Sequence, residues 1–160
     1  MTLNDLLPLF GYSELNADLD QLLSSAGTSV RSLSAKTLRA EGSDAIELKP
    51  LGLELAFWER EGYERKVATP KDTGNAIFVA AFAYGPGSKS FKPYVGPVPF
   101  SKGPIATRED ALREFGAPTL TEEEDDVVEW DQWLKEGLQV RATYQDDGAL
   151  WNLSFSVPFK

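Results

Sequence analysis

Carboxylates are the side chains that could do chemistry in this chain, and five of them form an unbroken run, Glu122–Asp126. A calcium or magnesium site takes its carboxylates from alternating positions of a loop that turns at a glycine. Five consecutive acidic residues lack that spacing. A pair of carboxylates could also cleave glycosides, but no separation between two carboxylates follows from the sequence. We therefore interpret the run as a solvated acidic loop or a surface for a partner, and we predict no metal site.

Several common catalytic chemistries need side chains that this chain lacks, although carboxylate, lysine and tyrosine chemistry would still be available. Its 160 residues include neither His nor Cys. Ser-His-Asp and Cys-His catalysis, disulfides and the usual zinc sites are therefore excluded. The Gly-Pro-Gly segment at 85–87 also lacks the Gly-Lys-Ser/Thr ending of a phosphate loop. We predict that the protein is not an enzyme, with no catalytic residues and no cofactor.

The net charge of −9 limits the classes of partner. An acidic surface repels phosphate and anionic lipid, which argues against binding to nucleic acid or membrane. It favours a basic protein partner, or it serves solubility alone. The N-terminal segment has no signal-peptide pattern, and no apolar run approaches the roughly 20 residues that span a bilayer. We expect a cytoplasmic protein.

A two-stranded hairpin over Gly137–Val157 is the clearest structural signal in the chain. Apolar and polar residues alternate on both sides of Asp147-Gly148. This alternation places one set of side chains on a buried face and the other in water. An Asp-Gly pair between two such runs predicts a type I′ turn, in which both central residues have positive φ.

The ends of two helices can also be located. The first helix has Asn16 as its N-cap, an apolar stripe that includes Leu19, Leu22 and Leu23, and Gly27 as its end. The second begins at Thr107, where Asp110 has the spacing of a capping box, and it ends at Gly116.

The other segments are predicted as strands, loops or a connector. Strands are expected at residues 45–50, 53–61, 76–84 and 127–134. We interpret residues 5–12 as extended or loop, residues 28–43 as at most a weak strand, and residues 61–75 as a long loop. Residues 85–106 hold five of the ten prolines and form a connector.

The order of these elements predicts an α+β fold in one domain, residues 1–160. Two halves, 5–85 and 97–158, are joined by the connector 85–106. We interpret the halves as a tandem repeat of one helix followed by three antiparallel strands. Each unit is marginal by itself, so the two would share one antiparallel sheet with the helices on one face.

The strand pattern also suggests where two tryptophans point. If Val128, Trp130 and Leu134 face the core, then Trp133 points outward with Glu129 and Asp131. By the same reasoning Trp58 shares a face with Glu54. Large aromatic residues among acids on an open sheet face are typical anchors for a protein partner.

The segment 97–158 resembles a module of bacterial toxin systems. Its motifs are Pro97–Phe100, Thr107–Pro118, the Trp130–Trp133 spacing and Tyr144–Gly148. Such proteins resemble the immunity proteins of contact-dependent inhibition and type VI secretion systems. The tandem layout is also similar to that of the β-lactamase inhibitory protein. The resemblance implies an inhibitor, but it carries over no individual functional residue.

The leading hypothesis is an immunity protein that binds a cognate toxin and blocks its active or substrate site. The net charge would suit a basic toxin such as a nuclease. We expect a monomer or homodimer whose partner-binding residues are Trp58, Glu61, Glu64, Glu122, Glu123, Glu124, Asp125, Asp126, Glu129, Asp131 and Trp133. The alternative is a small-ligand or peptide-binding module, with a pocket between the sheet and the helices.

Overall fold

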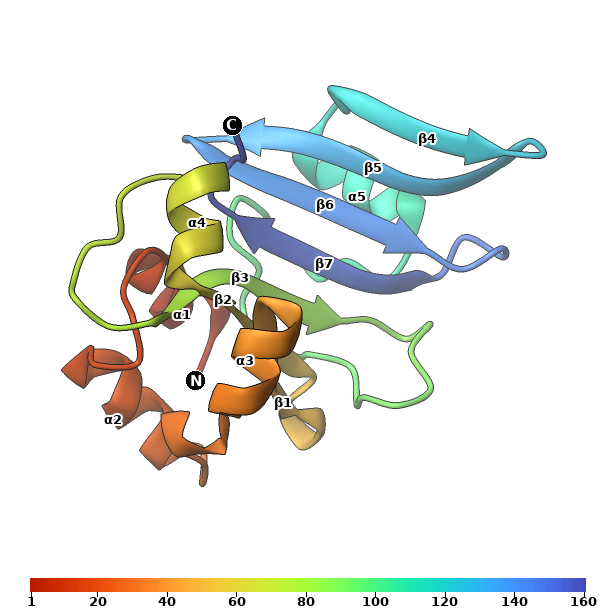
Figure 1. Cartoon of the computed structure of the whole chain (residues 1–160). Coiled ribbons are helices and arrows are strands. Elements are labelled where there is room, and N and C mark those ends of the chain that lie inside the picture. Colours follow the sequence, from red (N-terminus) through yellow and green to blue (C-terminus); the bar gives the residue numbers. More distant parts are fainter.

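One antiparallel sheet of seven strands organises the chain, in the order β1-β2-β3-β7-β6-β5-β4 (Figure 1). The computed structural model describes all residues 1–160. The strands are β1 (Ser43–Leu48), β2 (Leu53–Glu59), β3 (Ala76–Tyr84), β4 (Leu120–Glu124), β5 (Val127–Lys135), β6 (Leu138–Tyr144) and β7 (Leu150–Ser156). The helices are α1 (Leu3–Leu6), α2 (Ala17–Ser25), α3 (Ala35–Glu41), α4 (Arg60–Lys66) and α5 (Arg108–Phe115). Short 3-10 turns lie at Leu7–Leu9, Val30–Ser32 and Lys49–Leu51.

The predicted α+β class is confirmed, and so are the four expected strands and the hairpin β6–β7. The two expected helices are also present. Asn16 caps α2 by accepting a hydrogen bond from the Leu19 amide at 2.9 Å. Thr107 and Asp110 form the expected capping box at the start of α5.

The prediction of a type I′ turn at Asp147-Gly148 was wrong. Only Gly148 has positive φ there, and its amide donates to the Gln145 carbonyl at 2.9 Å, as in a type I turn that ends in a left-handed glycine. The side chain of Asp147 accepts from the Ala149 amide at 2.9 Å and holds Asp147 outside the left-handed region. Two other hairpins have both central residues at positive φ, Asp125-Asp126 and Glu136-Gly137.

Three segments that were predicted as loop or strand are helical. Residues 5–12 include part of α1 and the following 3-10 turn, residues 28–43 include α3, and the first part of 61–75 belongs to α4. Ser34 caps α3, and Gly42 ends it at a φ of 77°. Tyr63 of α4 and Val67, the residue that caps its C-terminus, lie one turn apart and are buried against the sheet. These helices are too short for an apolar period to be visible in the sequence.

The acidic run Glu122–Asp126 is not a loop throughout. Its first three residues belong to β4, and Asp125-Asp126 form the turn into β5. The second half therefore contributes four strands to the sheet, whereas the first contributes three. The predicted tandem repeat of one helix and three strands is not confirmed in that form.

Hydrophobic cores lie on both faces of the sheet. The larger core joins α1, α2, α3 and α5 to one face, with Phe57, Phe78 and Phe155 fully buried. The smaller core joins α4 to the opposite face of β3, through Ile77 and Val79. The prediction that the helices lie on one face is therefore not confirmed, because α4 has its own face (Figure 1).

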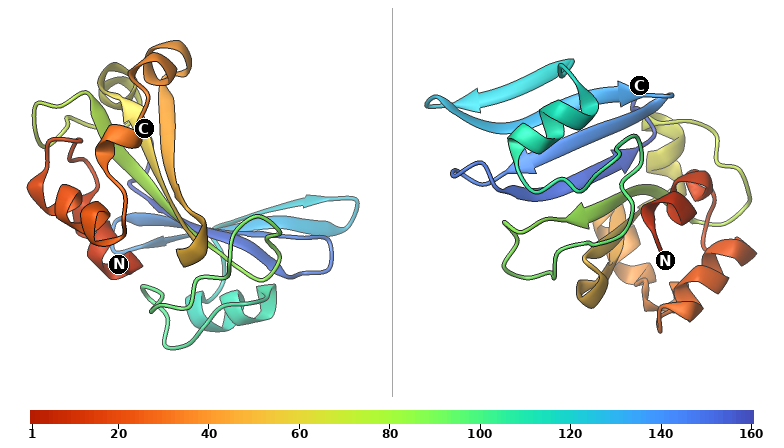
Figure 2. Two further views of the ribbon diagram at one scale, coloured as in Figure 1. Left: turned by 90° about the horizontal axis from the view of Figure 1, so that it is seen from below. Right: turned by 180° about the vertical axis from the view of Figure 1, so that it is seen from behind.

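The two halves meet at the centre of the sheet. Strand β3 pairs with β7, so that Ala81 lies opposite Phe155. The connector between the halves, residues 85–106, contains no helix or strand. It crosses the helix-bearing side of the sheet between α5 and the N-terminal helices (Figure 2).

Candidate protein-binding face

The side of β4–β7 that is turned away from α5 carries no helix, and we call it the open face (Figures 1 and 2). Period-two alternation decides which side chains it presents. One row crosses six strands through consecutive partners: Glu54, Phe82, Ser154, Arg141, Gln132 and Leu120. The row is polar at its centre, and small residues such as Ser154 leave a depression there.

This depression is a groove of about 500 Å³. Its residues are Glu54, Ala80, Phe82, Tyr84, Leu120, Gln132, Gln139, Arg141, Thr143, Trp151, Asn152, Ser154, Ser156 and Phe159. Four of the seven large apolar side chains that the protein exposes belong to the open face: Leu120, Leu134, Trp151 and Phe159. Exposed apolar groups around a polar groove are typical of a surface that binds another protein.

Arg141 is a fixed cation in this groove. Its guanidinium lies over the ring of Trp130 at 4.0 Å and donates to the Gln132 side chain at 2.7 Å. Burial lowers the pKa of Arg141, although a guanidinium keeps its charge in proteins. The contact with Trp130 therefore holds both side chains in place before any partner binds.

Trp58 lies on the same side of β2 as Glu54, as predicted, but it is largely buried by its neighbours. Phe159 packs on its ring at a centroid distance of 4.9 Å, and the Lys66 ammonium lies 5.7 Å from its centroid. The nearby helix α4 carries Glu61, which is exposed, and Glu64, which pairs with Arg60 at 2.8 Å. This region lies near the end of β7, whereas the β4–β5 turn lies at the opposite end of the sheet, where β7 begins.

Eight carboxylates gather at that other end of the sheet, where the β4–β5 and β6–β7 turns lie side by side (Figure 1). We call this cluster the acidic end. Its members are Glu122, Glu123, Glu124, Asp125, Asp126, Glu129, Asp146 and Asp147. All eight are exposed, and none forms a salt bridge.

Glu129 shows the effect of this crowding. A hydrogen bond with Glu124 raises the pKa of Glu129, and partial desolvation and the charges of Glu124, Glu122 and Asp146 raise it further. Like charges disfavour one another when no cation lies between them. The acidic end therefore carries a field that would attract a basic partner.

Two of the predicted site residues, Trp133 and Asp131, are buried and do not lie on the surface. Trp133 was expected to point outward, but it is 2% exposed and packs on Phe115, with its indole N–H donating to the Gly116 carbonyl at 2.9 Å. Asp131 is also completely buried. A bulge explains the error, because Glu129 has no partner on β4 and Val128 therefore shares the core face with Asp131 and Trp133.

Asp131 is part of a buried hydrogen-bond network. It accepts from Arg108 at 2.8 Å, from the Tyr144 hydroxyl at 2.8 Å and from the Thr121 hydroxyl at 2.6 Å. Burial acts to raise the pKa of Asp131, but the hydrogen bonds from Arg108, Thr121 and Tyr144 together hold it below its ordinary value. Asp131 and Trp133 thus stabilise the fold from inside and cannot contact a partner.

Sequence reasoning missed Trp151, Arg141 and Leu134. Trp151 belongs to the hairpin that was expected to bury it, and a register shift at Thr143/Tyr144 turns it to the open face. The alternation of apolar and polar residues along β6 could have located Arg141, because it places Arg141 on the solvent side of the strand.

No group of three or more carboxylates has the arrangement of a metal site. None of the helices is long and apolar enough to cross a membrane. In comparisons with known proteins, the chain matches no family, no curated protein sequence and no solved structure.

Proposed function

We propose that this chain is a non-catalytic inhibitor that binds a basic bacterial toxin domain through the open face and the acidic end. The bound chain covers the active or substrate site of the toxin. The observation that carries the proposal is the position of an uncovered sheet face with exposed apolar residues beside eight carboxylates that have no salt-bridge partner.

The apolar part of this surface supplies contact area. Trp151 and Phe159 are 40% and 48% exposed, and Leu134 is 60% exposed. Large side chains that are already held by neighbours lose little conformational freedom on binding and often dominate the energy of an interface. Tyr84 holds Trp151 in an edge contact at a centroid distance of 6.0 Å, and Trp58 holds Phe159.

The acidic end supplies attraction at long range. A surface of one sign accelerates association with a partner of the opposite sign and disfavours partners of the same sign. A toxin that cleaves nucleic acid needs a basic surface for phosphate, and the acidic end could occupy that surface. The similarity of residues 97–158 to immunity modules supports a toxin as the partner.

Two leucines give a matched test of the binding face. Leu134 lies on the open face and is 60% exposed, whereas Leu15 precedes α2 and is 64% exposed. We expect Leu134→Ala to weaken binding about tenfold, because its side chain would be buried in the complex. Leu15→Ala should change binding less than twofold.

The measurement uses the protein encoded beside this chain as the toxin candidate. Co-expression should protect cells from that toxin, and titration calorimetry of the purified pair gives the affinity of each variant. An absence of both protection and binding would refute the proposed function. Equal effects of Leu134→Ala and Leu15→Ala would refute the binding face but not the function.

A further inference from the structure

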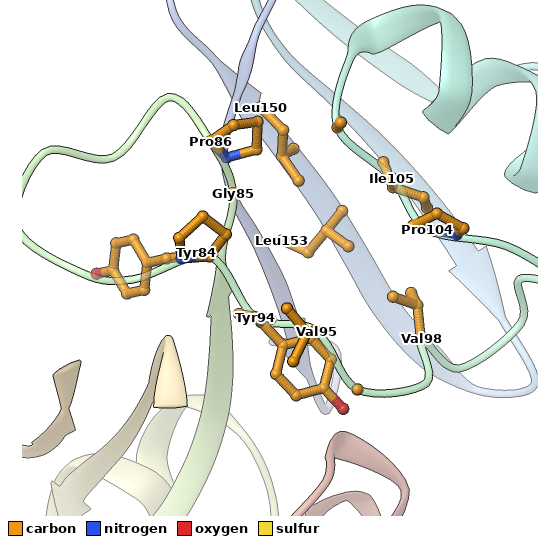
Figure 3. Close-up of a pocket in the computed structure, with 14 residues that line it drawn as sticks. Tyr84, Gly85, Pro86, Tyr94, Val95, Val98, Pro104, Ile105, Leu150 and Leu153 are labelled. Atoms are coloured by element: carbon orange, nitrogen blue, oxygen red, sulfur yellow. The ribbon is translucent and has the colours of Figure 1, made fainter. Parts of the chain in front are cut away.

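A second site lies on the other side of the sheet, beneath the connector. It is a cavity of about 230 Å³ between the connector and the ends of β3 and β7, and we call it the connector cavity (Figure 3). Leu150 and Leu153 of β7 form its floor, and Ala83 of β3 also lines it. Connector residues form its walls, among them Tyr94, Val95, Val98, Pro104 and Ile105.

The cavity exists because the helical layer has a gap over the central strands. The N-terminal helices cover the first half of the sheet, α5 covers the second, and only the connector crosses between them (Figure 2). Ala83 lines this gap, and its small side chain leaves space beneath the connector. The connector cannot collapse into this space easily, because its prolines fix the backbone angle φ.

Hydrogen bonds hold both walls to the strands. The Tyr94 amide donates to the Tyr84 carbonyl at 2.8 Å on one side, and the Leu150 amide donates to the Ala106 carbonyl at 2.9 Å on the other. The close approach at the end of β3 depends on Gly85, where a Cβ atom would lie 2.5 Å from the Leu150 carbonyl oxygen. The walls are therefore formed before any ligand enters.

The lining indicates what kind of molecule would bind. No Asp, Glu, Lys or Arg lines the cavity, and the Tyr94 hydroxyl is already used by the Pro97 carbonyl and the Leu3 amide. A charged ligand would lose its hydration here without compensation. The rim carries Val95, which is 96% exposed, more than any other large apolar side chain of the protein.

The volume limits the size of the ligand. An apolar cavity of about 150 Å³ in another protein binds benzene. A cavity of 230 Å³ therefore accommodates one substituted aromatic ring or a branched aliphatic chain of similar size. Larger ligand sites usually begin at about 300 Å³.

We propose that the connector cavity is a binding site for a small uncharged apolar molecule, about the size of a substituted benzene ring. The site is separate from the proposed function, because it opens on the helix-bearing side of the sheet. Its occupant is held by apolar contact with Leu150, Leu153, Val98 and Ile105, and Val95 offers a further apolar contact at the rim.

Toluene, p-cresol and benzoate test this proposal with the intact protein. Methyl resonances of Val98, Ile105 and Leu153 should shift in NMR spectra during titration with toluene or p-cresol, while those of Leu15 and Leu134 stay constant. Benzoate has a ring of the same size with a charge, and we expect it to bind at least tenfold more weakly. An absence of shifts with both neutral probes, or equal binding of benzoate, would overturn the proposal.

Two variants separate binding from folding. Val98→Trp fills the cavity and should abolish the toluene shifts. Val95→Ser changes an exposed rim residue, keeps the fold intact and should weaken toluene binding by about threefold. Circular dichroism checks the fold of both proteins. Wild-type affinity for toluene in both folded variants would show that the ligand binds elsewhere.

Discussion

Asp131 is the only charged side chain that is buried in this protein. Its network ties α5 through Arg108, β4 through Thr121 and β6 through Tyr144 to the middle of β5. A buried carboxylate is tolerated only where such partners replace its hydration. Asp131 therefore fixes the elements that support the acidic end, although it cannot take part in binding itself.

We expect Asp131→Asn to lower the free energy of unfolding by about 2 to 3 kcal/mol at neutral pH, because Arg108 loses its buried counter-charge. The hydrogen bonds hold the pKa of Asp131 below the unfolded value of about 3.9. Its contribution to stability is therefore complete above that value and disappears as the pH falls through the lower folded pKa. Urea unfolding of wild type and variant measures the difference, which should shrink between about pH 5 and pH 2.

Asp146→Asn is the control for this comparison, because Asp146 is exposed and forms no salt bridge. It should change the free energy of unfolding by less than about 0.5 kcal/mol. If Asp131→Asn lowered the free energy of unfolding by the same amount at both ends of that pH range, an ionised Asp131 in the folded protein would be contradicted.

At the scale of single elements, two acidic turns of similar sequence have opposite backbone requirements. Asp125-Asp126 joins β4 to β5 with φ values of 52° and 64°, a region that favours glycine and asparagine. Asp147 has no positive φ and uses its carboxylate to hold the Ala149 amide. Replacement of an aspartate by glycine should therefore have opposite effects on the free energy of unfolding in the two turns.

We expect Asp126→Gly to raise the free energy of unfolding by about 0.5 kcal/mol, because glycine relieves the left-handed strain. Asp147→Gly should lower it by about 1 kcal/mol, because it removes a hydrogen bond and loosens the unfolded chain. Thermal and urea unfolding measure both changes. Asp126→Asn controls for the loss of charge, and changes of the same sign in the two glycine variants would contradict these turn assignments.

Some of the helices and strands could be predicted from the sequence, and others could not. Helices α2 and α5 were predictable because Asn16 and Thr107 are strong caps ahead of an apolar stripe. Helix α4 has only two turns, and its buried residues are too few to form a period. The face of Trp133 depends on the bulge at Glu129, and such a bulge arises from pairing with β4, which a single strand cannot reveal.

At the scale of the whole molecule, the pairing of β3 with β7 makes two marginal halves into one sheet with two unequal sides. The candidate surfaces follow from that arrangement. The open face exists because α4 covers only the β3 side, and the connector cavity exists because no helix covers the centre of the other side. The sequence suggested an open sheet face and a pocket beside the helices, but not which strands and segments form them, since each surface depends on which elements are absent from a layer.

The distribution of charge over the whole molecule leads to a prediction about association. Lysine at Glu122, Glu123 and Glu124 would remove most of the negative charge of the acidic end, because five carboxylates and three lysines would replace eight carboxylates, while the groove stays unchanged. With a basic partner, the association rate constant should fall at least tenfold at low salt, because long-range attraction steers encounters. The dissociation rate should change much less, and added salt should reduce the difference between wild type and variant.

A second variant carries lysine at Asp18, Asp20 and Glu41, which are exposed on α2 and α3. It has the same net charge as the first variant but keeps the acidic end intact. Surface plasmon resonance at several salt concentrations compares the two. If the acidic end steers the partner, the control should associate within about threefold of wild type. Equal slowing of both variants would mean that net charge, rather than the acidic end, controls association.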